Sequence, residues 1–213
     1  MFKFMALYSM IQFLTVTMLY YIGSDFNAWQ FLYIDMFIVI PLSITMSRTG
    51  PYHTLDKSRP VGHLISFTVL FSVIFQIVIQ AIFQIIIYIT LYNQRWFKPL
   101  VPYDNKNFLC LENTVLFMYS TTQYLIVVIV LSVGKPFRKS MWSNYWLIFT
   151  IVVSGGLTYL MIFTHNPAIT KLMGLLDIPS KFRFFIAGLS VVNLLVSYGV
   201  EKLHLYMMRK ISE

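Results

Sequence analysis

Long apolar runs separated by short polar breaks recur six times along the chain. We place them approximately at residues 2–22, 29–46, 63–92, 114–133, 145–164 and 182–207. Each run is long enough to span a membrane, because a transmembrane helix needs about 17 to 25 predominantly apolar residues. The run at residues 67–91 is continuous, whereas the strands of a membrane barrel alternate apolar and polar residues. The pattern therefore predicts an all-α polytopic membrane protein, a bundle of six transmembrane helices.

Composition and charge extend this picture. Of the 213 residues, 58% are hydrophobic and 11% charged, and the mean hydropathy of +0.70 lies outside the range of soluble domains. An even number of spans, six, brings both termini to one side of the membrane. If that side is the cytosol, the cytosolic segments hold ten of the 16 Lys and Arg residues. We therefore expect both termini to be cytosolic. The net charge of +8 reflects this bias and gives no support to nucleic-acid binding.

One carboxylate, Asp35, lies inside the second run. An ionised carboxylate there costs at least about 2.5 kcal/mol, so it should face protein or water and have a partner; a transport role is favoured over a structural one. Pro41 has no N–H, so we expect the carbonyl of Phe37 to stay free and to suit a cation, with a plain kink as the alternative. Phe31 stands one turn before Asp35, so an amine could touch a ring and a carboxylate together.

The first run carries a polar stripe, in which Tyr8, Gln12 and Thr15 follow helical spacing. Such a stripe either joins helices or lines a pathway, and periodicity alone favours helix contact. The connection to the second run is short, so the two helices are expected to be antiparallel neighbours. Gln12 and Asp35 could then share a site.

Other polar positions are assigned to packing. The third run has neutral side chains four residues apart, Gln76, Gln80, Gln84 and Tyr88. Neutral amides at this spacing fit helix contact better than a cation site. Residues 154–156, Ser-Gly-Gly, suggest a surface of close helix approach, and Asn193 is a single polar contact of unknown role.

Metal and catalytic signals are weak. Glu201 and His204 form one Glu-x-x-His spacing, which di-metal bundles use in pairs, but no second copy is present. A solvated helix end is the favoured interpretation. The sequence contains no P-loop, nucleophile elbow or zinc spacing, so no catalytic or metal-ligating residue is assigned. The single cysteine, Cys110, excludes an intrachain disulfide. The loop at residues 46–62 suits either a solvated turn or the docking of a cytosolic domain.

Several segments resemble one family. "FKFMALYSMIQF" and "QFLYIDMFIVIPLSITMSRTGP", with "ENTVLFMYSTTQYLI" and "GKPFRKSMWSN" further on, resemble the carboxy-terminal half of the type-5B P-type ATPases, the polyamine-exporting pumps of late endosomes and lysosomes. The resemblance covers nearly all of the chain, residues 1–213, as a single transmembrane domain, the family's helices five to ten. It implies polyamine contacts at Tyr8, Gln12, Phe31 and Asp35, and so moves the stripe of the first run from helix contact to pathway lining.

The chain departs from the family pattern in two ways. The family often has a second acidic residue three positions before the aromatic, where Ala28 stands here, and Asp25 is the candidate to replace it. The phosphorylated aspartate, the nucleotide-binding domain and the actuator domain of the family have no counterpart, so the sequence suggests a fragment or a truncated product. No cofactor is expected in this chain, and ATP and magnesium are expected for the complete pump.

Three functions remain open at this point. The leading hypothesis is the membrane part of an ATP-driven pump that moves polyamines or other cations across a late endosomal or lysosomal membrane. Its partners would be the bilayer, the substrate and the amino-terminal part of the pump, and the chain alone should not hydrolyse ATP. The alternative is a free-standing six-helix scaffold or regulator of a full-length pump. A passive channel ranks last, because only Asp35 is available as a charge within the spans.

Overall fold

The computed structural model describes residues 1–53, 67–100, 107–132, 134, 137–164 and 166–212. Every regular element in these ranges is a helix, and six helical segments are long and apolar enough to cross a membrane. They are α1 (Phe2–Tyr21), the segment Ala28–Ser47, α4 (Phe67–Tyr92), α5 (Leu111–Leu131), α6 (Tyr145–Phe163) and α8 (Ser180–Ser212). The predicted class, an all-α membrane protein with six spans, is confirmed.

The second span is irregular. It begins as α2 (Ala28–Leu32), widens into the π-helix η1 (Tyr33–Val39) and ends as α3 (Ile40–Ser47). Two short helices lie between spans, η2 (Met141–Ser143) before α6 and α7 (Pro167–Met173) after it. The spans agree with the predicted ones to within a few residues at most ends, and residues 63–66 and 133 lie outside the part that the structure describes.

Helix α5 begins at Leu111, three residues before the start predicted for the fourth span, and a helix cap explains the difference. Cys110 has an extended backbone, and its sulfur accepts a hydrogen bond from the N–H of Asn113 at 3.3 Å. It therefore caps α5, satisfying one of the N–H groups that a helix start leaves without a partner. Polar residues of the first turn, Glu112 and Asn113, are fully buried. A hydropathy pattern places them outside the span, because it does not show that protein surrounds them.

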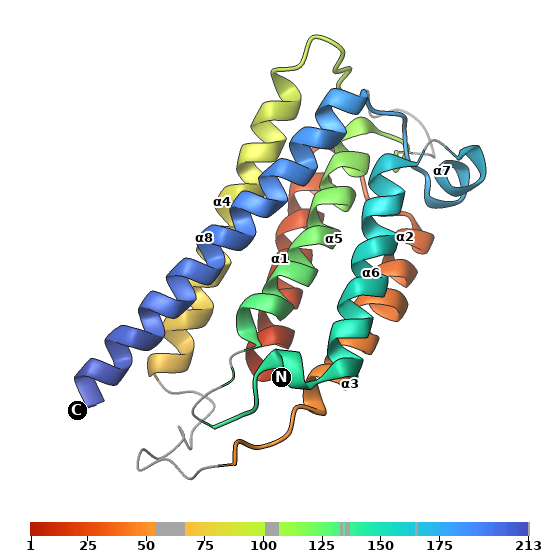
Figure 1. Cartoon of the computed structure of the whole chain (residues 1–213). Coiled ribbons are helices and arrows are strands. Elements are labelled where there is room, and N and C mark those ends of the chain that lie inside the picture. The colour runs from red at the N-terminus through yellow and green to blue at the C-terminus, as the bar shows by residue number, and fades with distance from the viewer. Residues whose placement is uncertain (54–66, 101–106, 133, 135–136, 165, 213) are drawn as a thin grey trace.

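Helix α5 is the centre of the bundle. In its apolar window 89% of the residues are buried, against 22–39% in the other five spans. It contacts α1, α4, α6 and α8, and Figure 1 shows it between α1 and α6. Polar side chains are tolerated on all its faces, because they meet protein rather than lipid. The outer spans instead turn large apolar side chains outward, such as Phe13, Phe149 and Leu195.

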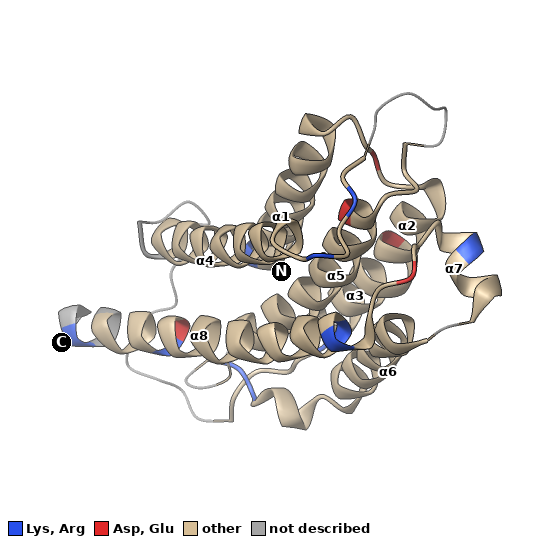
Figure 2. Ribbon diagram, turned by 90° about the horizontal axis from the view of Figure 1, so that it is seen from above, with Lys and Arg blue, Asp and Glu red and all other residues tan. Residues whose placement is uncertain are grey.

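Helices α4 and α8 form a tilted pair beside this centre (Figure 1). The start of α1 and the end of α8 lie at the same end of the bundle, which we call the terminal end, and the other is the opposite end. At the terminal end, Nζ of Lys3 lies 3.2 Å from Oε1 of Glu201. Figure 2 shows few charged residues along the helices, as expected for segments that cross a bilayer.

Candidate functional site

Asp35 lies in the wide turn of the second span. Within η1 the N–H of Ile40 donates to the carbonyl of Asp35, five residues back instead of four. Pro41 follows directly, and in a regular α-helix its ring would clash with the carbonyl four residues earlier. The π turn is a way to accommodate such a residue, and single π turns occur frequently at functional sites.

The carbonyl of Phe37 is not free, as the sequence pattern had led us to expect. The hydroxyl of Ser154 in α6 donates a hydrogen bond to it at 3.1 Å. The predicted extra oxygen ligand for a cation is therefore wrong, and a helix–helix contact takes its place. The predicted close approach at residues 154–156 holds at Ser154, which is 3% exposed, whereas a Cβ added at Gly156 would meet no atom within 4 Å.

Tyr8 of α1 joins Asp35 across the helix interface. Its hydroxyl donates to Oδ1 of Asp35 at 2.8 Å, and both side chains are half-buried. Among the residues that the structure describes, no other hydrogen bond or ion pair reaches this carboxylate. Within the described ranges Asp35 therefore has one neutral partner and an oxygen without a partner, which suits a cation better than a permanently paired structural carboxylate would.

The other residues predicted for the site, and Thr15 of the same stripe, differ in burial and in hydrogen bonding. Phe31 is half-buried and packs edge-to-face on Phe26, with ring centroids 5.3 Å apart. Gln12 is half-buried one turn after Tyr8, and its amide makes no hydrogen bond within the described ranges. Thr15 departs from the stripe, because it is fully buried and accepts a hydrogen bond from Gln84 of α4 at 2.8 Å. The stripe thus divides into a half-open part, Tyr8 and Gln12, and a helix contact at Thr15.

The glutamine stripe of α4 forms a buried network, as the packing assignment predicted. Nε2 of Gln123 in α5 donates to the backbone oxygen and to Oε1 of Gln80, both at 2.9 Å, and Gln84 donates to Gln123 at the same distance. Asn193 of α8 has a defined role here, since its amide donates to Gln80 at 2.9 Å. Gln76 donates to the carbonyl of Ser197 at 3.0 Å. The network therefore joins α4, α5 and α8.

The predicted solvated end at Glu201 and His204 is wrong. Glu201 is 2% exposed and His204 5% exposed. The hydroxyl of Ser72 donates to both oxygens of Glu201, at 3.0 and 2.8 Å, and Lys3 lies beside it. The ring of His204 stacks on Phe71. Among the described residues no group of three His, Cys, Asp or Glu side chains that could hold a metal occurs. The bonds of Glu201 to Ser72 and Lys3 join α8 to α4 and α1.

Sequence reasoning missed a buried arginine at the opposite end. Arg183 is 1% exposed, and its guanidinium donates to the carbonyls of Ile162, Thr164 and Ile178 at 2.7–2.9 Å and pairs with Asp177. It thereby satisfies carbonyls at the end of α6 that have no helical partner. The sequence shows only an arginine near the start of the sixth apolar run, and such an arginine can be exposed as readily as buried.

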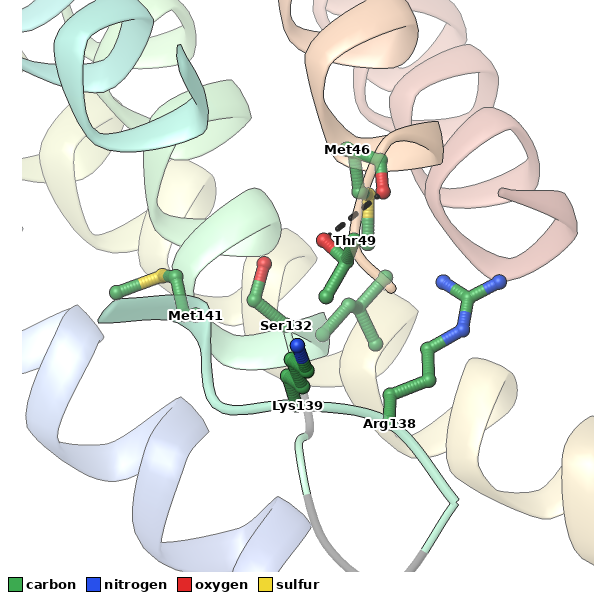
Figure 3. Close-up of a pocket in the computed structure, with 7 residues that line it drawn as sticks. Met46, Thr49, Ser132, Arg138, Lys139 and Met141 are labelled. Carbon is green, nitrogen blue, oxygen red and sulfur yellow. Dashed lines mark hydrogen bonds between the residues drawn. The ribbon is translucent and has the colours of Figure 1, made fainter. Parts of the chain in front are cut away.

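A small, shallow pocket lies at the terminal end, away from the predicted site residues (Figure 3). It is lined by Met46, Thr49, Leu131, Ser132, Arg138, Lys139 and Met141. None of these belongs to the predicted site, so the pocket does not mark the place of Asp35. Figure 3 shows the pocket between the end of α3 and the segment that precedes α6.

The two segments that flank this pocket are tied together. The N–H of Lys139 donates to the carbonyl of Gly50 at 3.0 Å, and that of Tyr52 donates to the carbonyl of Phe137 at 3.1 Å. The side chain of Asn144 adds a bond to the carbonyl of Thr45 at 2.8 Å. The described part of the predicted loop, residues 46–53, is therefore held against its neighbour rather than being a free turn. Residues 54–62 lie outside the described ranges.

These features define an integral, multi-pass helical membrane protein with a half-buried carboxylate in an irregular turn. The family model described as "Cation transporting ATPase, C-terminus" matches residues 23–203. The chain belongs to this family of cation-transporting ATPases, and it corresponds to the carboxy-terminal membrane region.

Curated relatives of the type-13A P-type ATPases agree with this assignment. The chain is 37% identical over 194 residues to the vacuolar cation-transporting ATPase YPK9 of Saccharomyces cerevisiae, covering 90% of the chain and 13% of the yeast protein. It is 36% identical over 204 residues to the polyamine-transporting ATPase 13A2 of Mus musculus, covering 94% and 17%. It is 33% identical over 208 residues to the probable cation-transporting ATPase catp-6 of Caenorhabditis elegans, covering 95% and 16%. The chain thus spans less than a fifth of each of these relatives.

Proposed function

We propose that this chain supplies part of the substrate site in the membrane region of an ATP-driven pump for polyamines or related organic cations. The observation that carries the proposal is the state of Asp35, a half-buried carboxylate within a span that has one neutral partner, Tyr8. A protonated amine supplies the missing countercharge, and charge-assisted hydrogen bonds of this kind are stronger than those between neutral groups.

The neighbouring side chains suit an amine with an aliphatic chain. Phe31 offers a half-buried ring one turn before Asp35, and a ring face attracts a cation as well as methylene groups. Gln12 offers an amide without a hydrogen-bond partner in the described part of the chain, one turn after Tyr8. Separated ammonium groups of one polyamine would then meet a carboxylate and a neutral acceptor along the interface of α1 and η1.

The remaining functions of the pump fall to parts outside this chain. ATP and magnesium would be bound by the amino-terminal portion, and energy coupling would require that portion. We propose that both termini of the chain face the cytosol, because this placement puts ten of the 16 Lys and Arg residues there. A late endosomal or lysosomal membrane is the proposed location, in line with the vacuolar relative of yeast.

The test is Asp35→Asn in a complete pump that contains this segment. Polyamine-stimulated ATPase activity, measured with spermine in detergent micelles, should fall at least about tenfold, because the amide cannot neutralise an ammonium group. Thermal stability should change little, since an amide oxygen can still accept the hydrogen bond from Tyr8.

Glu201→Gln is the matched control. It removes the same charge from another span, but Glu201 is held by Ser72 and Lys3 at the terminal end. The control should leave the KM for spermine unchanged. Unchanged stimulation in Asp35→Asn, or an equal loss in both variants, would show that Asp35 does not bind the substrate.

A further inference from the structure

One hydroxyl in the middle of the bundle has no hydrogen bond. Tyr124 of α5 is 0% exposed, and its hydroxyl oxygen has no partner in the structure. Ser120, one turn earlier on α5, does not donate to it, because its own hydroxyl donates to the carbonyl of Phe117 at 3.1 Å. Bulk water does not serve this position, because protein surrounds the helix on all sides. A buried group of this kind requires an explanation.

The unpaired hydroxyl belongs to the neighbourhood of Asp35. The ring of Tyr124 meets the ring of Tyr8 edge-on, with centroids 5.7 Å apart and an interplanar angle of 64°. Tyr8 in turn donates its hydroxyl hydrogen to Asp35. Three side chains from three helices, α1, η1 and α5, therefore form one polar cluster inside the spans.

The hydrogen bond between Tyr8 and Asp35 describes the site without a cation. Tyr8 has a single hydroxyl hydrogen, and Asp35 accepts it. An ammonium group that contacts both oxygens of this carboxylate competes with Tyr8 for Oδ1 and can displace its hydroxyl. The displaced hydrogen then needs another acceptor, because an unmade hydrogen bond in a buried site is costly. The oxygen of Tyr124 is an unpaired acceptor on a residue whose ring contacts the ring of Tyr8.

We propose that Tyr124 is a positioning residue of the amine site, which accepts the hydrogen bond of Tyr8 when a protonated amine occupies Asp35. No covalent bond changes in this exchange: the hydrogen stays on Tyr8 and only its acceptor changes. The unsatisfied hydroxyl then belongs to the empty site and is relieved when the site fills, so it favours binding. The proposal rests on the proposed role of Asp35 as an amine contact.

A purely structural role for Tyr124 predicts a different result. If its hydroxyl were merely buried without a partner, replacing Tyr124 by phenylalanine would leave stability equal or higher and would not affect the amine. Tyr119 provides the comparison, since it lies on the same helix, is 0% exposed and accepts a hydrogen bond from Asn193 at 3.2 Å. Tyr119→Phe should lower the melting temperature and leave the KM for spermine unchanged.

The experiment compares Tyr124→Phe, Tyr119→Phe and Asp35→Asn in a complete pump that contains this segment, with spermine as the probe. Tyr124→Phe should raise the KM of spermine-stimulated ATPase activity roughly 5- to 10-fold, with kcat within about twofold, as expected for an interaction made only on binding. The stabilisation of the protein by spermine against heat should shrink in parallel, while the melting temperature without spermine should not fall.

A Tyr8→Phe background sharpens the test. There the donor of the exchanged hydrogen bond is gone, so adding Tyr124→Phe should have no further effect on the KM. An unchanged KM in Tyr124→Phe, or an equal increase with and without the hydroxyl of Tyr8, overturns the inference. If Asp35→Asn loses stimulation while Tyr124→Phe keeps its KM, only this inference fails. If Asp35→Asn keeps its stimulation, the proposed function fails first.

Discussion

The glutamine network and the Asp35 cluster are both polar and both lie within the spans, yet they differ in burial and in the number of hydrogen bonds that their central residues make. In the network, the side chains of Gln80, Gln123 and Asn193 are fully buried and bond one another across three helices. In the cluster, Tyr8 and Asp35 are half-buried and share a single hydrogen bond.

This difference separates polar groups that hold helices together from those that remain available to a ligand. A polar side chain in a bilayer is stable when all its donors and acceptors meet protein. Glu201 shows that charge alone does not decide the matter, because it receives hydrogen bonds from Ser72 on both oxygens and pairs with Lys3. Partial exposure together with a single neutral partner among the described residues, rather than the presence of a carboxylate, is what distinguishes Asp35 from Glu201.

The largest effect on stability is expected for Gln123→Leu. This variant removes two hydrogen bonds to Gln80 and one from Gln84, and interhelical hydrogen bonds in membranes contribute on average about 0.6 kcal/mol each. The free energy of unfolding, measured by SDS titration in mixed micelles, should fall by about 2 kcal/mol. Gln12→Leu is the matched control and should change it by less than about 0.5 kcal/mol. Equal losses in the two variants would abolish the distinction between network and cluster.

A smaller effect is expected for Glu201→Gln. The amide keeps Ser72 as a partner but loses the charge that faces Lys3, so the free energy of unfolding should fall by about 1 kcal/mol. The same titration measures it. Lys202→Met, which removes an exposed cation over the ring of Tyr198, serves as a control with a loss below about 0.5 kcal/mol. A variant as stable as the parent protein would mean that the contact between α1 and α8 contributes nothing.

The smallest effect is expected at Cys110, just outside the span of α5. Burial raises the pKa of its thiol above the ordinary value, so the thiolate fraction at neutral pH is reduced and becomes appreciable only at higher pH. Alkylation by N-ethylmaleimide at pH 7 should be at least about tenfold slower in the folded protein than in SDS. Cys110→Ser should change the free energy of unfolding by less than about 0.5 kcal/mol, because serine also caps helices. Rapid labelling of the folded protein would contradict this.

Much of the fold could be predicted from the sequence, because lipid imposes a simple rule on helix length and hydropathy. The six spans and the packing role of the α4 glutamines follow from it. For the candidate site, Asp35 and Tyr8 stand out as polar residues in apolar runs, and the structure places them in contact.

The features that the sequence did not predict depend on partners that are distant in the sequence. The carbonyl of Phe37 is satisfied by Ser154, 117 residues away, and Glu201 is buried by Ser72 and Lys3, 129 and 198 residues away. Tyr124 has an ordinary position in an apolar run, and only the contact with Tyr8 connects it to Asp35. Periodicity describes one helix at a time and does not report which helix lies opposite.

The central position of α5 also constrains how the protein can be made. The ribosome synthesises this fourth span before α6 and α8, yet its buried polar groups include Tyr119, whose partner Asn193 lies in α8. Gln123 of α5 has its partners in α4, which is made earlier, whereas the partner of Tyr119 is made only when α8 follows. A nascent chain that stops before α8 therefore leaves a buried hydroxyl of the most deeply buried span without its partner.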